Sequence, residues 1–322
     1  QGLVQGGQVH GKSLLPLPGM VYSSFPLSPP SYRNPRLLPT YVEIIELLLK
    51  VLKNLSMEPL ALNSLESAGI LETLMPLLAG PLVGARTHIL PCLFNMCRIN
   101  KRRQDRVAEL GLVPHLKKVI SAGSPLRQFA LPILFDLAHT SDASRAQLMR
   151  CDCVPFFLDL LQEHYWQAFA LNSLAVWMSS DSKSVASMIV EPVHLDKLIE
   201  FFKSVSTQTV HSLHKPLLDM MIKSESLCTA LGGQPFTAAL IKRLRATKEA
   251  IVLRSLLKML QLLHEFHLDA RAWLTANGLY TLVTELAQSK QVLVRQQAAK
   301  LVLDFAATLE SVEEVGEGLE ER

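Results

Sequence analysis

The sequence repeats with a period of 41 or 42 residues, and this period restricts the fold more than any other feature. A short apolar helix in each unit ends at an equivalent residue, and successive equivalents lie 42, 41, 41, 42 and 42 residues apart. The equivalent residues are Leu78, Ile120, Leu161, Phe202, Leu244 and Leu286. A fixed period of this length is typical of stacked repeats, in which each unit contacts only its neighbours.

Each unit has the pattern of three helices. Apolar residues recur at helical spacing, as in Leu256, Leu257, Leu260 and Leu263. Four units place a residue that tolerates turn geometry before the second helix, namely Gly69, Gly111, Asp152 and Gly278. A polar residue opens the expected third helix, at Arg86, Arg127, Gln167, His211, Arg254 and Arg295. Pro91, Pro132 and Pro216 each follow such an opening by five residues, inside the expected third helix.

This pattern predicts an all-α, armadillo/HEAT-like right-handed solenoid of six repeats over residues 41–309. The long third helices are expected to line a concave groove, and the groove is expected to bind a protein partner. Residues 1–40 are rich in Gly and Pro and predict a flexible linker, and residues 310–322 predict an acidic tail.

The composition limits the classes of partner that the chain is expected to bind and the cellular compartment in which it is expected to lie. The 32 basic and 29 acidic side chains give a net charge of +3, too little for a nucleic-acid or anionic membrane surface on a chain of 322 residues. No apolar run is long enough to span a membrane. Five scattered cysteines indicate reduced thiols and a cytoplasmic or nuclear location. Because the chain starts at Gln1 without a signal peptide, we expect it to be an internal part of a longer protein.

The sequence contains only poor matches to the catalytic and nucleotide-binding motifs of enzymes. Residues Gly6–Ser13 match the G-x-x-x-x-G-K-[ST] phosphate loop, but Pro16 and Pro18 prevent the helix that such a loop requires. The Asp-Phe-Ala at 304–306 resembles the Asp-Phe-Gly of kinases only by chance, because its phase places Phe305 in a helical core. We therefore predict no catalytic residue and no cofactor.

Metal ligation is not expected either. Cys151 with Cys153, Cys92 with Cys97, and the pairs His211/His214 and His264/His267 each lack a second pair of ligands. The expectation is structural cysteines and surface histidines.

The partner is expected to contact polar residues at the openings of the third helices, with two aromatic residues at the rim. These candidates are Arg86, Arg127, Gln128, Gln167 and Asn172, with Tyr165 and Trp166 at the rim. Phe169 and Trp177 are expected in the core. A basic run, Arg98, Lys101, Arg102, Arg103 and Arg106, predicts either a solvated turn between repeats or an edge for an acidic protein partner. Lys242, Arg243 and Arg245 repeat this pattern more weakly.

Two segments, SPLRQFALPILFDLAHTS (Ser124–Ser141) and HYWQAFALNSLAVWMSSDS (His164–Ser182), resemble the C-terminal armadillo region of fungal septation-initiation Ser/Thr kinases and of the plant MAP kinase kinase kinase epsilon group. The resemblance implies a kinase domain far N-terminal in the parent protein. It also implies a role in cytokinesis downstream of a small Ras-like GTPase, at the spindle pole body or division site. The resemblance also allows a scaffold protein as the partner.

The alternative is a free-standing armadillo adaptor of the transport-receptor type. Such receptors repeat Trp-x-x-x-Asn along successive third helices, and this chain has that spacing at Trp273 and Asn277, before the Gly278 turn and on a different helix.

Overall fold

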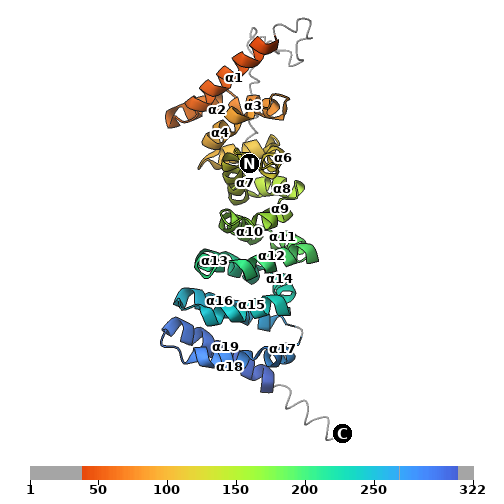
Figure 1. The fold of residues 1–322 in the computed structure, drawn as a ribbon, viewed down its shortest axis with the longest axis vertical. Coiled ribbons are helices and arrows are strands. Elements are labelled where there is room, and N and C mark those ends of the chain that lie inside the picture. The colour runs from red at the N-terminus through yellow and green to blue at the C-terminus, as the bar shows by residue number, and fades with distance from the viewer. Residues whose placement is uncertain (1–37, 268, 311–322) are drawn as a thin grey trace, which may run out of the picture. The chain divides into compact units, whose positions relative to one another are not determined.

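The computed structural model describes residues 38–267 and 269–310, which form helices and no strand. The repeats lie in one compact unit that begins at Ile45 (Figure 1). Residues 1–37 of the predicted linker, residues 311–322 of the predicted tail and the match at Gly6–Ser13 lie outside the described residues, whereas residues 38–40 and 310 are helical.

Six three-helix repeats follow a single helix, α1 (Leu38–Leu55), and a 3₁₀ turn, η1 (Pro59–Ala61). The first helices are α2 (Leu62–Ser67), α5 (Lys101–Glu109), α8 (Asp142–Arg150), α11 (Ser182–Ile189), α14 (Glu225–Leu231) and α17 (Ala270–Asn277). The second helices are α3 (Ile70–Ala79), α6 (Leu112–Ser121), α9 (Cys153–Leu160), α12 (Pro192–Ser204), α15 (Gln234–Ala246) and α18 (Leu279–Ala287). The third helices are α4 (Arg86–Cys97), α7 (Arg127–Thr140), α10 (Gln167–Ser180), α13 (Thr207–Lys223), α16 (Ala250–Glu265) and α19 (Val292–Glu310).

The first helix of repeats 2 to 6 begins with the same hydrogen bond. A side-chain oxygen of the N-cap residue accepts from the backbone N–H three residues later, at 3.0–3.2 Å. The N-cap residues are Asn100, Ser141, Asp181, Ser224 and Asp269. Each bond satisfies an N–H that has no partner within the helix, so these short polar side chains fix where the repeats begin.

The turn before the second helix has a left-handed residue in the four repeats where the sequence predicted a turn. Gly69, Gly111, Asp152 and Gly278 have φ of 72°, 86°, 50° and 58°. In repeats 4 and 5 the second helices α12 and α15 instead carry Pro192 and Pro235 in their first turn. Proline fits there because its fixed φ matches the helix and its missing N–H would lack a partner anyway.

The third helices confirm some predicted boundaries and correct others. Arg86, Arg127 and Gln167 are the first residues of α4, α7 and α10, as predicted. The predicted openings His211, Arg254 and Arg295 are wrong, because α13, α16 and α19 begin three or four residues earlier. Three prolines lie inside third helices, at Pro91, Pro132 and Pro216.

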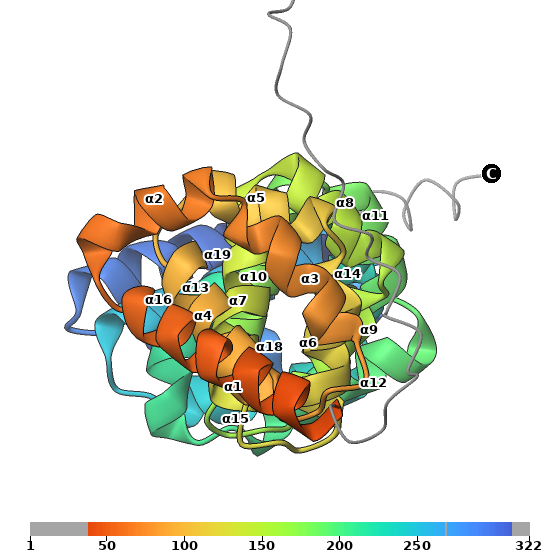
Figure 2. The same ribbon diagram turned by 90° about the horizontal axis from the view of Figure 1, so that it is seen from above.

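Stacking of the repeats creates one continuous core. Each of the third helices from α4 to α19 packs on the third helix of the next repeat, and in the view along the stack these helices overlap (Figure 2). The buried apolar residues form one cluster from Leu49 to Phe305. The predicted all-α armadillo-like solenoid is thereby confirmed. Within residues 38–267 and 269–310, no helix has the length and hydropathy required to span a bilayer.

We predict that Gly111→Ala lowers the free energy of unfolding by about 1 kcal/mol, because a Cβ is strained at positive φ. No atom lies within 4 Å of the added Cβ, so a steric clash contributes nothing. Urea denaturation followed by circular dichroism measures the change. Asp152→Gly is the matched control, and it is expected to leave stability equal or higher because it relieves the same strain. Equal stability of Gly111→Ala and the parent chain would contradict the assignment.

Candidate functional site

An open aromatic pocket lies on the third helices of repeats 2 and 3. It has a volume of about 540 Å³ and is lined by Gln128, Pro132, Phe135 and Asp136 from α7, and by Tyr165, Trp166 and Phe169 at the start of α10. Aromatic residues make up only 6% of the chain, so this concentration is unusual. We call it the α7–α10 pocket.

The rings of the α7–α10 pocket hold one another in place. Phe135 is 4% exposed and stacks on Phe169 with 5.9 Å between ring centroids. Trp166 lies 5.9 Å from Phe169 and 4.6 Å from Tyr165, the latter edge to face. Tyr165 is nevertheless 74% exposed and Phe169 53% exposed. Large aromatic side chains positioned by packing and open to solvent are the residues that most often anchor protein interfaces.

Asp136 gives this pocket a negative charge. Its carboxylate accepts a long hydrogen bond of 3.4 Å from Gln104 Nε2, and no basic side chain within the described ranges forms an ion pair with it. Burial raises the pKa of Asp136 above its usual value, because partial desolvation disfavours the charged form. The pocket therefore favours a partner that brings a hydrogen-bond donor or a positive charge.

The predicted contact residues are only partly brought together. Gln128, Tyr165 and Trp166 line the pocket, whereas Gln167 is buried and its amide bonds to His164 Nδ1 at 3.1 Å. Arg127 Nη2 donates to both carboxylate oxygens of Glu163 at 2.7 Å.

The two remaining predicted residues, Arg86 and Asn172, lie outside the pocket lining, Arg86 half-buried and Asn172 exposed.

The predicted core position of Phe169 is wrong, and Asp136 is a pocket residue that was not among the predicted contacts. Trp177 is buried, as predicted, but Phe169 is not a core residue, because it faces outward beside Phe135. Asp136 had a sequence signal: it is the one charged residue in the apolar stretch Phe129–Ala138. An acid within such a stretch marks a helix face that is open to solvent or to a partner.

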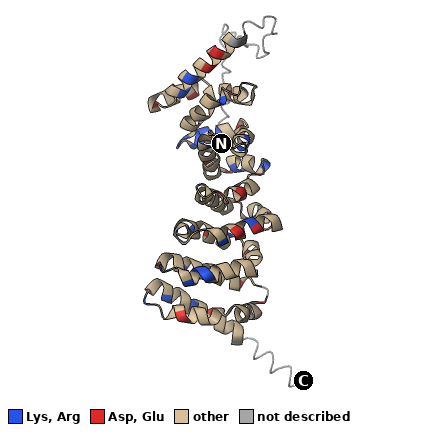
Figure 3. Cartoon of the chain, in the orientation of Figure 1, with Lys and Arg blue, Asp and Glu red and all other residues tan. Residues whose placement is uncertain are grey.

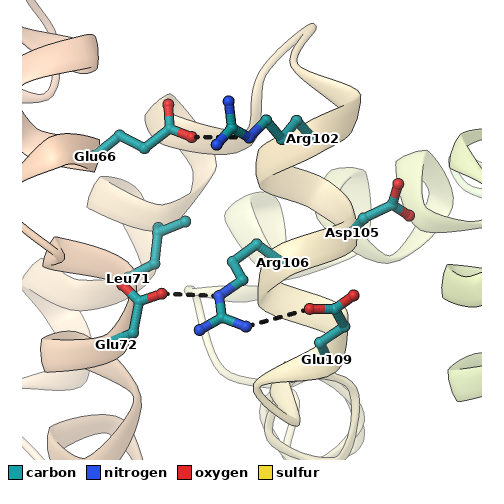
Figure 4. A pocket seen from close by; sticks show the side chains of 7 residues that line it. All are labelled: Glu66, Leu71, Glu72, Arg102, Asp105, Arg106 and Glu109. Carbon is teal, nitrogen blue, oxygen red and sulfur yellow. Dashed lines mark hydrogen bonds and ion pairs between the residues drawn. The ribbon is translucent and has the colours of Figure 1, made fainter. Parts of the chain in front are cut away.

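Two arginines of the basic run join the first two repeats, whereas Arg98, Lys101 and Arg102 are exposed. Arg103 is 3% exposed, and its guanidinium donates to Glu66 at 2.8 Å and to Asn63 Oδ1 at 2.6 Å. Arg106 pairs with Glu72 at 2.8 Å and with Glu109 at 3.2 Å (Figure 4). The prediction of a solvated turn is therefore wrong for Arg103, which is a buried structural cation. Along the stack, basic and acidic residues are interspersed (Figure 3).

Cysteines and histidines of the described region form no group of three or more potential metal ligands. Burial raises the pKa of Cys97, Cys153 and Cys228 to about 12, so these thiols are neutral packing groups at physiological pH. The expectation that His264 is a surface residue is wrong, because its ring is buried and packs edge to face on Phe305, 4.8 Å away. Phe305 itself is a core residue, as predicted.

Comparison with solved structures supports the fold. An engineered protein superposes with a TM-score of 0.61 at 18% identity, covering 82% of this chain and 67% of that protein. A second engineered protein gives a TM-score of 0.54, covering 73% of this chain and 98% of the other. No protein-family model matches the sequence.

Several curated proteins are similar in sequence to this chain. MAP3K epsilon protein kinase 2 of Arabidopsis thaliana is 35% identical over 272 residues, or 80% of this chain and 20% of that protein. Cytokinesis protein sepH of Emericella nidulans is 30% identical over 267 residues, 79% of this chain and 20% of that protein. The chain is homologous to one region of the MAP3K epsilon and septation kinases. Cell division control protein 7 of Schizosaccharomyces pombe matches at 27% identity over 80% of this chain and 25% of that protein.

The resemblance predicted from Ser124–Ser141 and His164–Ser182 is confirmed and extends over most of the repeats. The chain spans about a fifth of the length of the MAP3K epsilon and sepH kinases that it matches.

We predict that Arg103→Ala lowers the free energy of unfolding by about 3 kcal/mol, because it leaves Glu66 and Asn63 without their shared partner. Arg102→Ala is the matched control. Arg102 is 91% exposed and lies 3.9 Å from the same carboxylate, and its loss should change stability by less than about 0.5 kcal/mol. Denaturant unfolding of both variants measures the difference. Equal effects would mean that the arginines of this run act only as surface charges.

Proposed function

We propose that this chain is the partner-binding, regulatory armadillo domain of a septation-type Ser/Thr protein kinase, and that the α7–α10 pocket is its main contact. The observation that carries the proposal is the pair of exposed rings, Tyr165 and Phe169, held on a rigid aromatic base. Homology to MAP3K epsilon and sepH kinases supports the kinase context. In this proposal the repeat domain performs no chemistry and controls where the kinase acts.

The proposed partner is a small Ras-like GTPase, and the proposed place of action is the division site, including the spindle pole body. The name cytokinesis protein, carried by the sepH relative, supports a role in cell division. The α7–α10 pocket suits a partner that places an apolar side chain on Phe169 and a donor near Asp136. A nucleotide-dependent switch region of the GTPase is the element proposed to make this contact.

We predict that Tyr165→Ala and Phe169→Ala each weaken capture of a GTP-loaded Ras-like GTPase at least tenfold, because interface aromatics supply a large share of binding energy. Both side chains are exposed, so the free energy of unfolding should change by less than about 1 kcal/mol. The measurement is a pull-down with the whole 322-residue chain and GTPases loaded with GTP or GDP.

Val193→Ala is the matched control, because Val193 is an exposed apolar residue of α12 outside this pocket. Capture that ignores the bound nucleotide, or that both aromatic variants retain, would contradict the proposal. Capture of lysine-rich cargo peptides instead of GTPases would favour a free-standing adaptor.

A further inference from the structure

A second pocket lies between repeats 4 and 5, where the second helices α12 and α15 pack side by side. Its volume is about 520 Å³. Three basic side chains line it, Lys203 from the end of α12 and Lys242 and Arg243 from α15, and its lining contains no acidic residue. Small apolar side chains, including Ala238 and Ala239, form the rest of the wall. We call it the α12–α15 pocket.

Arg243 is a buried cation whose hydrogen bonds go to neutral groups. It is only 9% exposed, and Nε donates to the carbonyl oxygen of Phe202 at 3.1 Å while Nη2 donates to that of Val205 at 2.6 Å. The guanidinium also lies 4.9 Å from the centre of the Phe202 ring. These contacts fix its position, yet no carboxylate lies within ion-pair distance among the described residues.

Other arginines with little exposure show what Arg243 lacks. Arg103 pairs with Glu66, Arg127 with Glu163, and Arg145 with Asp142. Because Arg243 has no opposite charge beside it among the described residues, only its bonds to neutral carbonyls and its contact with the Phe202 ring offset the hydration it has lost, and burial lowers the pKa of Arg243. Its Nη1 takes part in none of the hydrogen bonds above, and Arg243 is one of the residues that line the pocket.

Two further features add positive potential. Lys242 is exposed and has no acidic partner in the described part of the chain, whereas Lys203 pairs with Glu200 at 2.6 Å. Ser206, which also lines the pocket, is the N-cap of the 17-residue helix α13. The N-terminal end of a helix carries partial positive charge and attracts anions. Neither Arg243 nor Lys242 therefore has an acidic partner among the described residues, and for Arg243 the carbonyl oxygens of Phe202 and Val205 offset part of the charge.

We propose that the α12–α15 pocket binds a phosphorylated serine or threonine side chain of a protein partner. A phosphate carries about −1.5 to −2 charges at neutral pH and offers three acceptor oxygens, so it matches two unpaired cations better than a single carboxylate does. A guanidinium held by backbone carbonyls needs no rearrangement to meet such a ligand. The small apolar wall leaves room for the peptide backbone. This site is separate from the α7–α10 pocket and from any GTPase contact.

The test uses degenerate peptide pools that differ only at one central residue, which is phosphoserine, serine or glutamate. The whole chain is expected to retain the phosphoserine pool and to retain the serine and glutamate pools at least tenfold less. Inorganic phosphate should compete, while chloride at the same ionic strength should not. Equal retention of the glutamate pool would overturn the proposal in favour of a general acidic-peptide site, and equal retention of the serine pool would remove the site altogether.

Lys242→Glu is the decisive variant and is expected to reduce retention of the phosphoserine pool at least tenfold. Arg245→Glu is its matched control, because Arg245 is an exposed residue of the same helix, outside the pocket lining, and the charge change is identical. Equal losses in the two variants would mean diffuse attraction by a basic surface and would overturn the proposal. Arg243 is left unchanged because its bonds to Phe202 and Val205 also support the fold.

These outcomes are independent of the proposed GTPase contact. Lys242→Glu should capture GTP-loaded GTPase as the parent chain does, and Phe169→Ala should retain the phosphoserine pool. The two proposals therefore fail separately.

Discussion

Burial of apolar surface between successive third helices is the interaction on which the rest of this structure depends. Leu93, Leu134 and Leu174, on three successive third helices, are fully buried within one continuous cluster. In a solenoid of this kind each repeat is stabilised by its neighbours, so the packing of adjacent repeats also positions the side chains at their junctions. The contacts between successive third helices therefore affect both the stability of the domain and the positions of its candidate sites.

Polar links one period apart reinforce the stack and fix its register. Asn95 bonds to Ser56 at 2.9 Å, Gln261 to Asp304 at 2.6 Å, and Trp273 Nε1 to the carbonyl oxygen of Gly232 at 3.1 Å. Apolar contact alone tolerates sliding, whereas a buried donor costs free energy unless it meets its acceptor. Arg103 and Arg127 belong to this set, since each pairs with an acid 36 or 37 residues earlier or later. Arg103 is therefore a link between repeats although it lies within a basic run of the sequence.

The sequence was sufficient for features that repeat and insufficient for features that depend on neighbouring repeats. The period, the all-helical class and the four left-handed turns follow from local chemistry, because glycine and the apolar spacing act within a few residues. Whether a side chain such as Arg103, His264 or Phe169 is buried depends on which face of its helix packs against the next repeat. The helical pattern predicts which residues share a face, but it does not predict which residues of the next repeat that face contacts. The scarcity of aromatic residues marks Tyr165 and Trp166 in the sequence, whereas Asp136 is a single acid in an apolar helix and gives a weaker signal.

Both candidate pockets occur where a repeat departs from the shared pattern. Repeat 3 places Tyr165 and Trp166 directly before its third helix, where repeats 1 and 2 have no aromatic residue. Phe169 of α10 corresponds in position to Phe129 of α7. Repeats 4 and 5 replace the left-handed residue by a proline start, and α12 and α15 reach 13 residues where the other second helices have 8 to 10. Lys203, Lys242 and Arg243 lie near the C-terminal ends of these two helices and line the α12–α15 pocket. Arg243 links the two repeats through the carbonyl oxygens of Phe202 and Val205, whereas Arg103 and Arg127 link repeats through acids. Its hydrogen bonds therefore account for its place in the stack, and its lack of an acidic partner among the described residues leaves a positive charge at the pocket that suits an anionic ligand.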